Sequence, residues 1–543
     1  MKKKVVVIGA GVAGITAGLE ILKNSNQYEV TILEESNNIG GISKTVQYKN
    51  NRMDIGGHRF FSKNQEVIEW WESILPSQGA PAYDDKKLSR DVNLSFNGAD
   101  PEKSDLVMLN RNRVSRIYFR KHFFDYPIKM NLATIKNLGF INTMIAGLSY
   151  LKAIIIKKPE TSLEQFYENR FGHKLYSLFF EKYTEKVWGR HPKDISADWG
   201  AQRVKGLSII AILKDIFYKS IPFLHNNKVE TSLIEEFKYP KYGPGQLWER
   251  AASIFENKGG NIKKNCKVIG VNTQGNRITS VMYHHGEKSE VIDADFVFSS
   301  MPLKDLVNDM EEVPRDVLEI ANGLPYRDFV TVGLLLDKLK ITNNTKMKTL
   351  NNLIPDCWIY VQDEYVKLGR IQIFNNWSPY MVGNPDSTVW IGLEYFCQEN
   401  DKFWNMSSEE WTQYGISELK KIDLIDEETG VLDSHCEKIK KAYPAYFDKY
   451  NQIDRLIQYL NQFDNLYCIG RNGQHRYNNM DHSMMTAFEA VKNMLSGDAR
   501  KDNIWNVNTE NQYHEVKDTV EKSNFTERKQ YTYVKSELDS QRV

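Results

Sequence analysis

Three glycines near the N-terminus have the spacing of a phosphate-binding turn. They occur as Gly9-x-Gly11-x-x-Gly14, directly after a run of β-branched residues. In this pattern the first glycine permits a tight turn, the second lets the backbone approach a pyrophosphate, and the third lets a helix pack closely on a strand. The N-terminus of that helix offers unpaired N–H groups and the positive end of its dipole to phosphate oxygens. The spacing therefore indicates that the chain binds a dinucleotide.

The segments around these glycines are the elements that such a turn requires. Val5-Val6-Val7-Ile8 predicts a buried strand, the residues after Gly11 predict a helix, and Glu29–Leu33 predicts a second strand that ends in Glu34. A carboxylate at that position can accept hydrogen bonds from ribose hydroxyls. Because the motif lies in the strand–turn–helix context that gives it meaning, we interpret it as the start of a Rossmann-type unit.

Two further glycine pairs follow closely in the chain, Gly40-Gly41 and Gly56-Gly57. Three glycine-rich loops so near one another suggest backbone that packs against an extended, flat ligand. A dinucleotide with a tricyclic ring, FAD, fits this expectation better than NAD does. We therefore expect the cofactor to be FAD.

Composition and cysteine spacing exclude several classes of protein. A chain of 543 residues suggests two or three domains, and a net charge of +1 gives no global field that would select nucleic acid as a partner. Five scattered cysteines without a C-x-x-C pair fit neither a zinc site nor a disulfide framework, so we expect no metal and a reducing compartment. Met1 leads through three lysines into the first strand, which is therefore fold rather than signal peptide. We expect a cytoplasmic protein.

The predicted elements divide the chain into discontinuous parts of an α/β protein. Strand–helix patterns typical of the first unit return after Gly243-Pro244-Gly245 and again before Gly470. Between them lie long helical patterns at Leu132–Lys157 and Ser162–Trp188, and then a region dominated by strands. We predict an FAD-binding domain at 1–86, 233–302 and 456–498, a largely helical insertion at 87–232, an antiparallel-sheet substrate domain at 303–455, and a polar tail at 499–543.

One apolar segment raises the question of membrane contact. Residues 138–156 are rich in Ile, Leu, Met and Ala, but four polar residues interrupt the segment and lysines flank it. It therefore falls short of a transmembrane run of about 18 apolar residues. We expect a helix that is buried or packed on the surface, and no transmembrane segment. A helix that lies flat on an anionic membrane, a peripheral contact, is the alternative.

Three widely separated features together resemble a known superfamily. A Rossmann-type start, a mid-chain strand that ends in Ser299-Ser300-Met301-Pro302, and a late strand that ends in Gly470-Arg471 before a helix are similar to the FAD-binding pattern of amine oxidases and protoporphyrinogen oxidases. Within that superfamily the chain most resembles UDP-galactopyranose mutases, in scattered motifs from about residue 5 to residue 495. The resemblance implies a Rossmann-type, amine oxidase-like (GR2) FAD-binding domain that carries inserted helical and antiparallel-sheet substrate domains.

Two local motifs resemble the mutase residues beside the flavin and the nucleotide. Gly56–Ser62 is similar to a mutase loop whose histidine, here His58, lies near one face of the flavin ring. Tyr183–Gly189 is similar to Tyr-Thr-x-Lys-x-Trp-Gly, whose tryptophan, here Trp188, helps to wall the nucleotide pocket. In the family an arginine on a mobile flap follows. Arg203 is the nearest match, and Arg190 competes with it.

Two further motifs resemble the mutase residues that bind diphosphate. Arg370–Tyr380 is similar to Arg-x-x-x-Phe-x-Asn-Tyr-Ser, and Gly470–Asp481 is similar to Gly-Arg-Leu-Gly-x-Tyr-x-Tyr-x-Asp-Met. Tyr360 and Tyr443 match two more tyrosines of the family. The chain departs from the last motif where the family has Tyr and Asp, since His475 and Asn479 stand there. A different sugar or a different reaction is therefore left open.

By this resemblance the site residues fall into three groups. The catalytic residues are His58, Arg203 and Arg370. The substrate-binding residues are Trp188, Arg203, Tyr360, Arg370, Asn376, Tyr443, Arg471 and Tyr477. The cofactor-binding residues are Gly9, Gly11, Val12, Ala13, Gly14, Glu34, Gly40, Gly41, Gly56, Gly57, His58, Val268, Gly470, Arg471, Asn479 and Met480.

The implied activity is that of an FAD-dependent nucleotide-sugar mutase of polysaccharide biosynthesis. Such an enzyme interconverts the pyranose and furanose forms of a UDP-sugar through an adduct on the N5 of reduced flavin, with no net redox change. NADPH and NADH are candidate reductants, although no nicotinamide-binding segment stands out. The sequence leaves the sugar and the oligomeric state open.

Two other interpretations stay open beside the mutase. The first is an FAD-dependent oxidoreductase that takes hydride from an amine, a saturated ring or a polyprenyl-type substrate. The second is a binding module without chemistry, against which the intact glycine loops argue. The arginine and tyrosine set favours the mutase, because arginine binds diphosphate oxygens through charge-assisted, bidentate hydrogen bonds.

Overall fold

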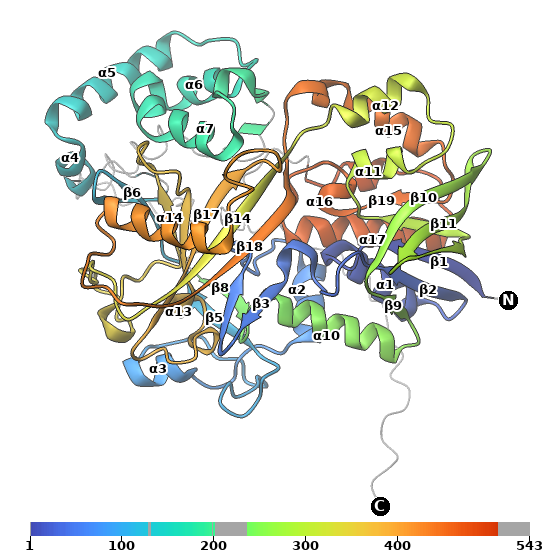
Figure 1. Cartoon of the computed structure of the whole chain (residues 1–543), viewed down its shortest axis with the longest axis horizontal. Coiled ribbons are helices and arrows are strands. Elements are labelled where there is room, and N and C mark those ends of the chain that lie inside the picture. Colours follow the sequence, from blue (N-terminus) through green and yellow to red (C-terminus); the bar gives the residue numbers. More distant parts are fainter. Residues whose placement is uncertain (1, 127, 129–131, 198, 201–235, 509–543) are drawn as a thin grey trace, which may run out of the picture.

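A parallel sheet of five strands forms the centre of one half of the molecule, on the right in Figure 1. The computed structural model describes residues 2–126, 128, 132–197, 199–200 and 236–508. The strand order is β19 (Leu466–Cys468), β13 (Phe296–Ser299), β1 (Lys3–Ile8), β2 (Tyr28–Leu33) and β9 (Asn261–Lys263), and all neighbours run parallel. The predicted Rossmann-type unit is confirmed, with α1 (Val12–Asn24) following β1.

The central strand β1 is apolar on both faces because both faces of the sheet are covered. Val5 and Val7 pack into the core on one face, and Val6 and Ile8 pack into the core on the other. The first core includes side chains of α1, α2 (Gln65–Ile74), α10 (Pro244–Asn257) and α17 (Met480–Ser496). The second includes the antiparallel strands β10 (Cys266–Gln274), β11 (Arg277–His285) and β12 (Lys288–Asp293), with α11 (Leu303–Asn308), α12 (Arg315–Asn322) and α15 (Ile453–Asn461).

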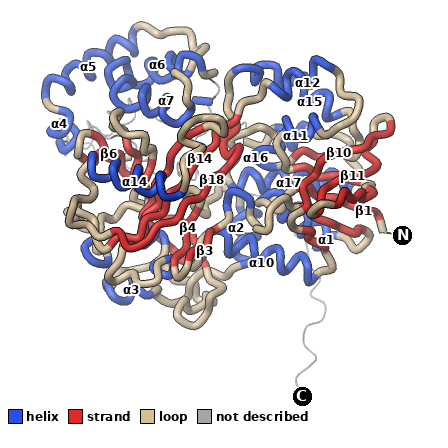
Figure 2. The backbone as a smooth tube through the Cα atoms, in the orientation of Figure 1, coloured by secondary structure: helices blue, strands red, loops and turns tan. Residues whose placement is uncertain are grey.

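A seven-stranded sheet runs through the other half of the molecule, on the left in Figure 2. Its order is β18 (Val431–Pro444), β14 (Tyr326–Leu336), β17 (Val389–Cys397), β16 (Arg370–Ile373), β15 (Trp358–Val361), β6 (Ser115–Phe119) and β7 (His122–Asp125). All neighbours are antiparallel except β15 and β6. Strands β6 and β7 come from the predicted insertion at 87–232, so this insertion contributes strands to the sheet as well as helices.

Short elements complete the two halves. Two-stranded ladders join β3 (Thr45–Tyr48) to β4 (Asn51–Asp54) and β5 (Met108–Asn112) to β8 (Glu236–Pro240). Further helices in the described residues are α3 (Tyr83–Leu88), α13 (Phe374–Trp377), α14 (Ser408–Lys421), α16 (Gly470–Gly473) and α18 (Asp502–Trp505). Trp505 of α18 packs into the second core of the parallel sheet, which anchors the beginning of the predicted polar tail.

A helical unit lies above the large sheet, at the upper left of Figure 1. It comprises α4 (Leu132–Leu138), α5 (Phe140–Ile155), α6 (Leu163–Tyr176), a π-helical turn at Ser177–Glu181 and α7 (Lys182–Trp188). The long helical patterns noted at Leu132–Lys157 and Ser162–Trp188 are helical in the structure, but each is divided into shorter helices. Gly139 with φ of 81° separates α4 from α5, and Gly172 with φ of 74° and ψ of 156° interrupts α6.

The break at Gly172 allows α5 and α6 to approach each other closely. A Cβ atom on this residue would lie 2.7 Å from the backbone nitrogen of Tyr150 in α5. The φ and ψ angles of Gly172 also belong to a region that side-chain-bearing residues avoid. Both features require glycine, so the sequence pattern for one long helix is overridden by packing.

Replacement of Gly172 by alanine should destabilise the protein by about 1–3 kcal/mol, because the new Cβ is strained and collides with α5. Gly147→Ala in α5 is the matched control, since a Cβ on Gly147 would meet no neighbouring group within 4 Å. That control should be neutral or stabilising by up to about 1 kcal/mol. Chemical denaturation followed by circular dichroism measures both. Equal stabilities of the two variants would contradict this account of the break.

Candidate active site

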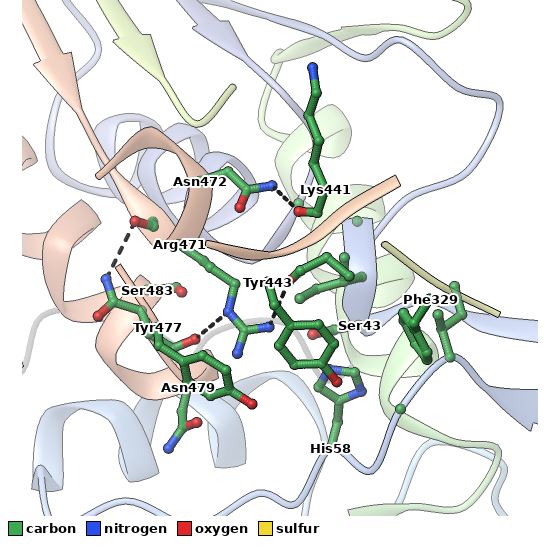
Figure 3. Close-up of a pocket in the computed structure, with 18 of the residues that line it drawn as sticks. Ser43, His58, Phe329, Lys441, Tyr443, Arg471, Asn472, Tyr477, Asn479 and Ser483 are labelled. Atoms are coloured by element: carbon green, nitrogen blue, oxygen red, sulfur yellow. Dashed lines mark hydrogen bonds between the residues drawn. The ribbon is translucent and has the colours of Figure 1, made fainter. Parts of the chain in front are cut away.

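A cavity of about 990 Å³ lies where the two halves of the molecule meet. Its wall includes residues of all three glycine loops, of the seven-stranded sheet and of the helical unit. Figure 3 shows part of this wall, with His58, Tyr443, Arg471 and Tyr477 gathered around one region. The cavity is therefore the place where the chemistry predicted from separate parts of the sequence comes together.

The first glycine loop is shaped by packing at two of its three glycines. Gly9 has a φ of 95°, and a Cβ on it would lie 2.3 Å from the Oγ of Ser300. A Cβ on Gly14 would lie 1.9 Å from the carbonyl oxygen of Gly9, so Gly14 serves helix–strand packing and does not line the cavity. Gly11 differs, because its Cβ would make only an ordinary contact of 3.8 Å with Gly41.

The N-terminus of α1 opens into the cavity at this loop. Gly11 is its N-cap, and Gly11, Val12 and Ala13 line the cavity wall. A second helix N-terminus lies there too, since Asn479 caps α17 and lines the wall with Met480. Helix N-termini carry partial positive charge and unpaired N–H groups, which suit the phosphates of a dinucleotide.

Hydrogen bonds fix the second glycine loop and Glu34 against the first loop. The amide of Gly40 donates to the carbonyl of Ala10 at 2.9 Å. Glu34 accepts the amide of Ala10 at 2.8 Å and the amide of Ser36 at 2.9 Å. Gly40, Gly41 and Glu34 all line the cavity. Because these bonds use backbone donors, they hold the carboxylate at the edge where ribose binding was predicted.

His58 presents a buried nitrogen without a protein partner. Its Nδ1 makes no hydrogen bond within the described part of the chain. Burial, together with the charge of Arg471, lowers the pKa of His58 to about 4, so the imidazole is neutral near neutral pH. The Gly56-Gly57 loop lies close to strand β15 of the large sheet. A Cβ atom on Gly57 would lie 2.6 Å from the ring of Trp358, so glycine is required there. An orphan polar atom of this kind fits a bound ligand.

These observations fit FAD. The backbone at Gly11 is open, two helix N-termini face the cavity, and His58 has a buried nitrogen to satisfy. Gly9, Gly56, Gly57, Val268, Gly470 and Arg471 complete the predicted cofactor set on the wall. Of that set, only Gly14 lies away from the cavity. The described residues contain no group of His, Cys, Asp and Glu side chains that could hold a metal ion.

Arg370 stands in the cavity wall as part of a buried cluster. Its Nε donates to the Tyr183 hydroxyl at 2.8 Å, and its Nη1 donates to both Glu394 and the Tyr443 hydroxyl at 3.3 Å. Glu394 is fully buried and lies directly opposite Arg370 on the neighbouring strand. Burial opposes the charge of Arg370, but the tyrosines and Glu394 outweigh it and raise its pKa above the usual range.

Arg471 lies beside Tyr443 and Tyr477, with His58 nearby, as Figure 3 shows. Its Nε donates to the carbonyl of Asn478 at 3.0 Å and its Nη1 to the carbonyl of Ala442 at 3.3 Å. The rings of Tyr443 and Tyr477 are stacked with centroids 5.5 Å apart, and the Arg471 guanidinium lies 4.4 Å from the Tyr477 ring centre. The acceptors in these two hydrogen bonds are neutral carbonyl oxygens.

The structure brings together six of the eight predicted substrate-binding residues. They are Trp188, Tyr360, Arg370, Tyr443, Arg471 and Tyr477, and all line the cavity. Trp188 packs edge-on against both Tyr443 and Tyr477 at 6.3 Å. Asn376 lies elsewhere, because its amide donates to the carbonyls of Ile354 and Asp356 at 2.8 Å outside the cavity. Arg203 falls outside the described residues, and its competitor Arg190 pairs with Asp448 away from the cavity wall.

Sequence reasoning missed three features of the site. Tyr183 and Glu394 hold Arg370, and strand register, which the sequence does not reveal, makes Glu394 its neighbour. The third feature is an apolar part of the cavity wall, called the apolar branch below, which α6 and the following π-helical turn provide through Tyr167, Phe171, Leu175, Phe179 and Phe180. The break at Gly172 and the π-helical turn divide these residues among different local conformations, so no single helical spacing in the sequence indicated that they share one wall.

Comparisons with known proteins agree with this fold. The family described as flavin-containing amine oxidoreductase matches residues 12–494. A crystal structure of reduced UDP-galactopyranose mutase is similar at 19% identity and a TM-score of 0.73, covering 94% of this chain and 100% of that one. A putative protoporphyrinogen oxidase from Exiguobacterium sp. 255-15 is similar at 14% identity and 0.63, covering 92% and 100%. A putrescine oxidase is similar at 12% identity and 0.55, covering 91% and 99%. At sequence identities this low, the similarity shows that the chains share a fold and nothing more specific.

Gly11→Ala should fold normally but bind FAD at least about tenfold more weakly. Its φ of −77° suits alanine and its Cβ meets only Gly41, so the expected loss comes from blocked approach of a pyrophosphate. The flavin absorbance per protein chain after purification measures this, with Gly147→Ala as control. Full flavin content in Gly11→Ala would show that the cofactor does not lie against this loop.

His475, which stands where the resemblance predicts tyrosine, should make the protein acid-sensitive. It is fully buried outside the cavity, with Nε2 at 3.0 Å from the carbonyl of Ala445. Burial lowers its pKa from 6.5 to about 4. Unfolding therefore takes up a proton between these values, so the stability that His475 contributes is complete above pH 6.5 and is lost as pH falls toward 4.

The variant His475→Asn removes this titration, and asparagine tolerates the φ of 49° at the site. Between about pH 7 and about pH 4.5 the variant should lose about 2–3 kcal/mol less stability than the parent protein. Urea denaturation at a series of pH values measures the difference. Parallel pH profiles for variant and parent would contradict the assignment.

Proposed function

The chain belongs to the family of flavin-containing amine oxidoreductases, and from that membership we propose that it is an FAD-dependent nucleotide-sugar mutase. The family implies an FAD cofactor. The proposed reaction interconverts the pyranose and furanose forms of a UDP-sugar without net oxidation. The observation that carries the proposal is the wall of two arginines and four tyrosines beside the cofactor loops, namely Arg370, Arg471, Tyr183, Tyr360, Tyr443 and Tyr477.

This wall has the chemistry that a nucleoside diphosphate requires. A diphosphate brings negative charge, and Arg471 offers a guanidinium whose contacts with Asn478 and Ala442 are to neutral oxygens. Tyrosine hydroxyls add donors without adding charge. Arg370 contributes differently, because Glu394 already balances its charge; its role is to hold the Tyr183 and Tyr443 hydroxyls in a rigid wall.

The remaining residues orient the reactants. His58 is neutral and lines the cavity beside Gly56 and Gly57, while Trp188 packs against Tyr443 and Tyr477 and stiffens the nucleotide wall. When bound and reduced, FAD supplies the nucleophile that such an exchange at the anomeric carbon requires. We propose NADPH or NADH as reductant. The flap role of Arg203 rests on the sequence motif.

A second function is favoured by the apolar branch of the cavity. Tyr167, Phe171, Leu175, Phe179 and Phe180 form a surface suited to a hydrocarbon rather than to a sugar. A net hydride transfer from an apolar substrate to FAD would use that surface. In this case the arginine and tyrosine wall would be a structural cluster with no diphosphate partner.

Turnover distinguishes the two functions. Holoprotein reduced with dithionite in the absence of oxygen is mixed with UDP-galactose and other nucleotide sugars, and the products are separated by chromatography. The mutase proposal expects a new product of unchanged mass with the reduced protein and none with the oxidised protein. No conversion of any nucleotide sugar, together with oxidation of an apolar substrate by the oxidised protein, would replace the proposal with the second function.

Arg471→Ala should weaken UDP binding by about 2–4 kcal/mol, because a diphosphate would lose a desolvated cationic partner. Isothermal titration of the oxidised holoprotein with UDP measures the change. Arg455→Ala is the control, since this exposed arginine pairs with Asp316 outside the cavity. Arg370→Ala is a poorer probe, because it would strand the buried Glu394 carboxylate and destabilise the fold. Unchanged UDP affinity in Arg471→Ala would contradict the proposed pocket.

A further inference from the structure

Helix α5 exposes an apolar stripe to the outside of the protein. The helix packs on α6 through one face, on which Ala146 and Tyr150 are buried. The large apolar residues Ile141, Met144, Leu148, Leu151 and Ile155 recur at alternating spacings of three and four, which aligns them on the opposite face. Their exposed fractions range from 51% for Met144 to 82% for Ile155. The expectation of a buried or packed helix therefore holds for one face of α5 only.

Further apolar residues on α4 and at the two ends of α5 are exposed as well. Phe140 at the start of the helix is 76% exposed, Leu132 at the start of α4 is 86% exposed, and Ile156 after the helix is 60% exposed. In Figure 1, α4 and α5 form the outer edge of the helical unit, far from the parallel sheet. Soluble surfaces rarely carry so continuous a set of apolar side chains unless something covers them.

The geometry of the two helices suits a position along a membrane surface. Within the described residues no single helix is long and apolar enough to cross a bilayer. The helices α4 and α5 together have sufficient length and composition, but a bend of 108° separates them. The 16 residues of α5 extend over roughly 24 Å, less than the hydrocarbon core of a bilayer. An apolar helix of this length can bury its exposed face while lying in the plane of the interface.

The sequence segment that carries the stripe contains basic residues and no acidic ones. From Tyr126 to Pro159 the sequence contains five lysines and no aspartate or glutamate, although the whole chain has a net charge of only +1. Lys136 and Lys152 are exposed on α4 and α5, whereas the two lysines after Ile156 are bound to α6: Lys157 donates to the carbonyl of Asn169, and Lys158 pairs with Glu168. Basic residues beside an apolar helical face attract anionic lipid headgroups.

We propose that α4 and α5 form a docking surface for an anionic phospholipid membrane, with the stripe of α5 in the interface and the lysines at the headgroups. A second copy of this chain is a less suitable occupant, because pairing two stripes would bring two sets of lysines together. The surface also bears on the cavity. Helix α6 packs on α5 and lines the apolar branch with Tyr167, Phe171 and Leu175, so docking would hold that branch near the lipid.

The test is cosedimentation of the full-length holoprotein with vesicles of phosphatidylglycerol and, separately, of phosphatidylcholine. The variant Leu148→Glu/Leu151→Glu places charges in the stripe, and Lys136→Glu/Lys152→Glu reverses the flanking charge. Phe96→Glu is the matched control, because Phe96 is fully exposed on a distant loop. Bound flavin and thermal midpoint confirm that each variant is folded, and gel filtration reports its oligomeric state.

The parent protein and Phe96→Glu should bind phosphatidylglycerol vesicles at least about tenfold more strongly than phosphatidylcholine vesicles, and high salt should weaken that binding. The stripe variant should lose binding at least about tenfold, and the lysine variant at least about fivefold. Absence of parent binding to phosphatidylglycerol would overturn the proposal. If the stripe variant instead converts a dimer to a monomer, or equals Phe96→Glu in every assay, then a second copy or another part of the chain covers the stripe, and the proposal is wrong.

Discussion

The close approach of two glycine loops, Gly9–Gly14 and Gly40-Gly41, at the edge of the parallel sheet is the constraint on which the rest of the structure depends. Gly11 and Gly41 bring two loops to within ordinary contact, and Gly40 is hydrogen-bonded to Ala10. Glycine is required at positions 9 and 14, because a Cβ atom at either position would collide with a neighbouring atom. This arrangement leaves the N-terminus of α1 uncovered, and α17 brings a second N-terminus to the same place. The glycine-loop side of the cavity therefore offers backbone N–H donors, which suit an extended anionic cofactor.

The opposite wall is built on a different principle, the burial of a charged pair. Arg370 and Glu394 lie opposite each other on the adjacent strands β16 and β17. The Arg370 guanidinium also donates hydrogen bonds to the hydroxyls of Tyr183 and Tyr443. A buried pair of this kind stabilises little by itself but is costly to break, so it fixes the positions of its tyrosines. Burial, with a smaller contribution from the charge of Arg471, lowers the pKa of His58, so the imidazole beside the cofactor loops is neutral near neutral pH.

The sequence predicted the parts of this structure that depend on local pattern. The strand, turn and helix from Val5 onward, the convergence of the glycine loops, and six residues that line the cavity opposite these loops could be identified from spacing and resemblance. Features that depend on packing or register could not. Glu394 becomes the partner of Arg370 only through strand pairing, and Gly172 breaks a helix because α5 lies against it. Asn376 matched a motif, yet its amide is committed to the carbonyls of Ile354 and Asp356 outside the cavity.

The central claim is that one cavity holds FAD on its glycine side and a nucleoside diphosphate on its arginine and tyrosine side. It is tested most directly by titrating the oxidised holoprotein with UDP and with uridine while the flavin absorbance is followed. UDP should perturb the flavin spectrum and bind at least about a hundredfold more tightly than uridine, because charge-assisted hydrogen bonds to its phosphates contribute about 1.5–3 kcal/mol each. Equal affinities for the two compounds, or no spectral response to UDP, would contradict the claim.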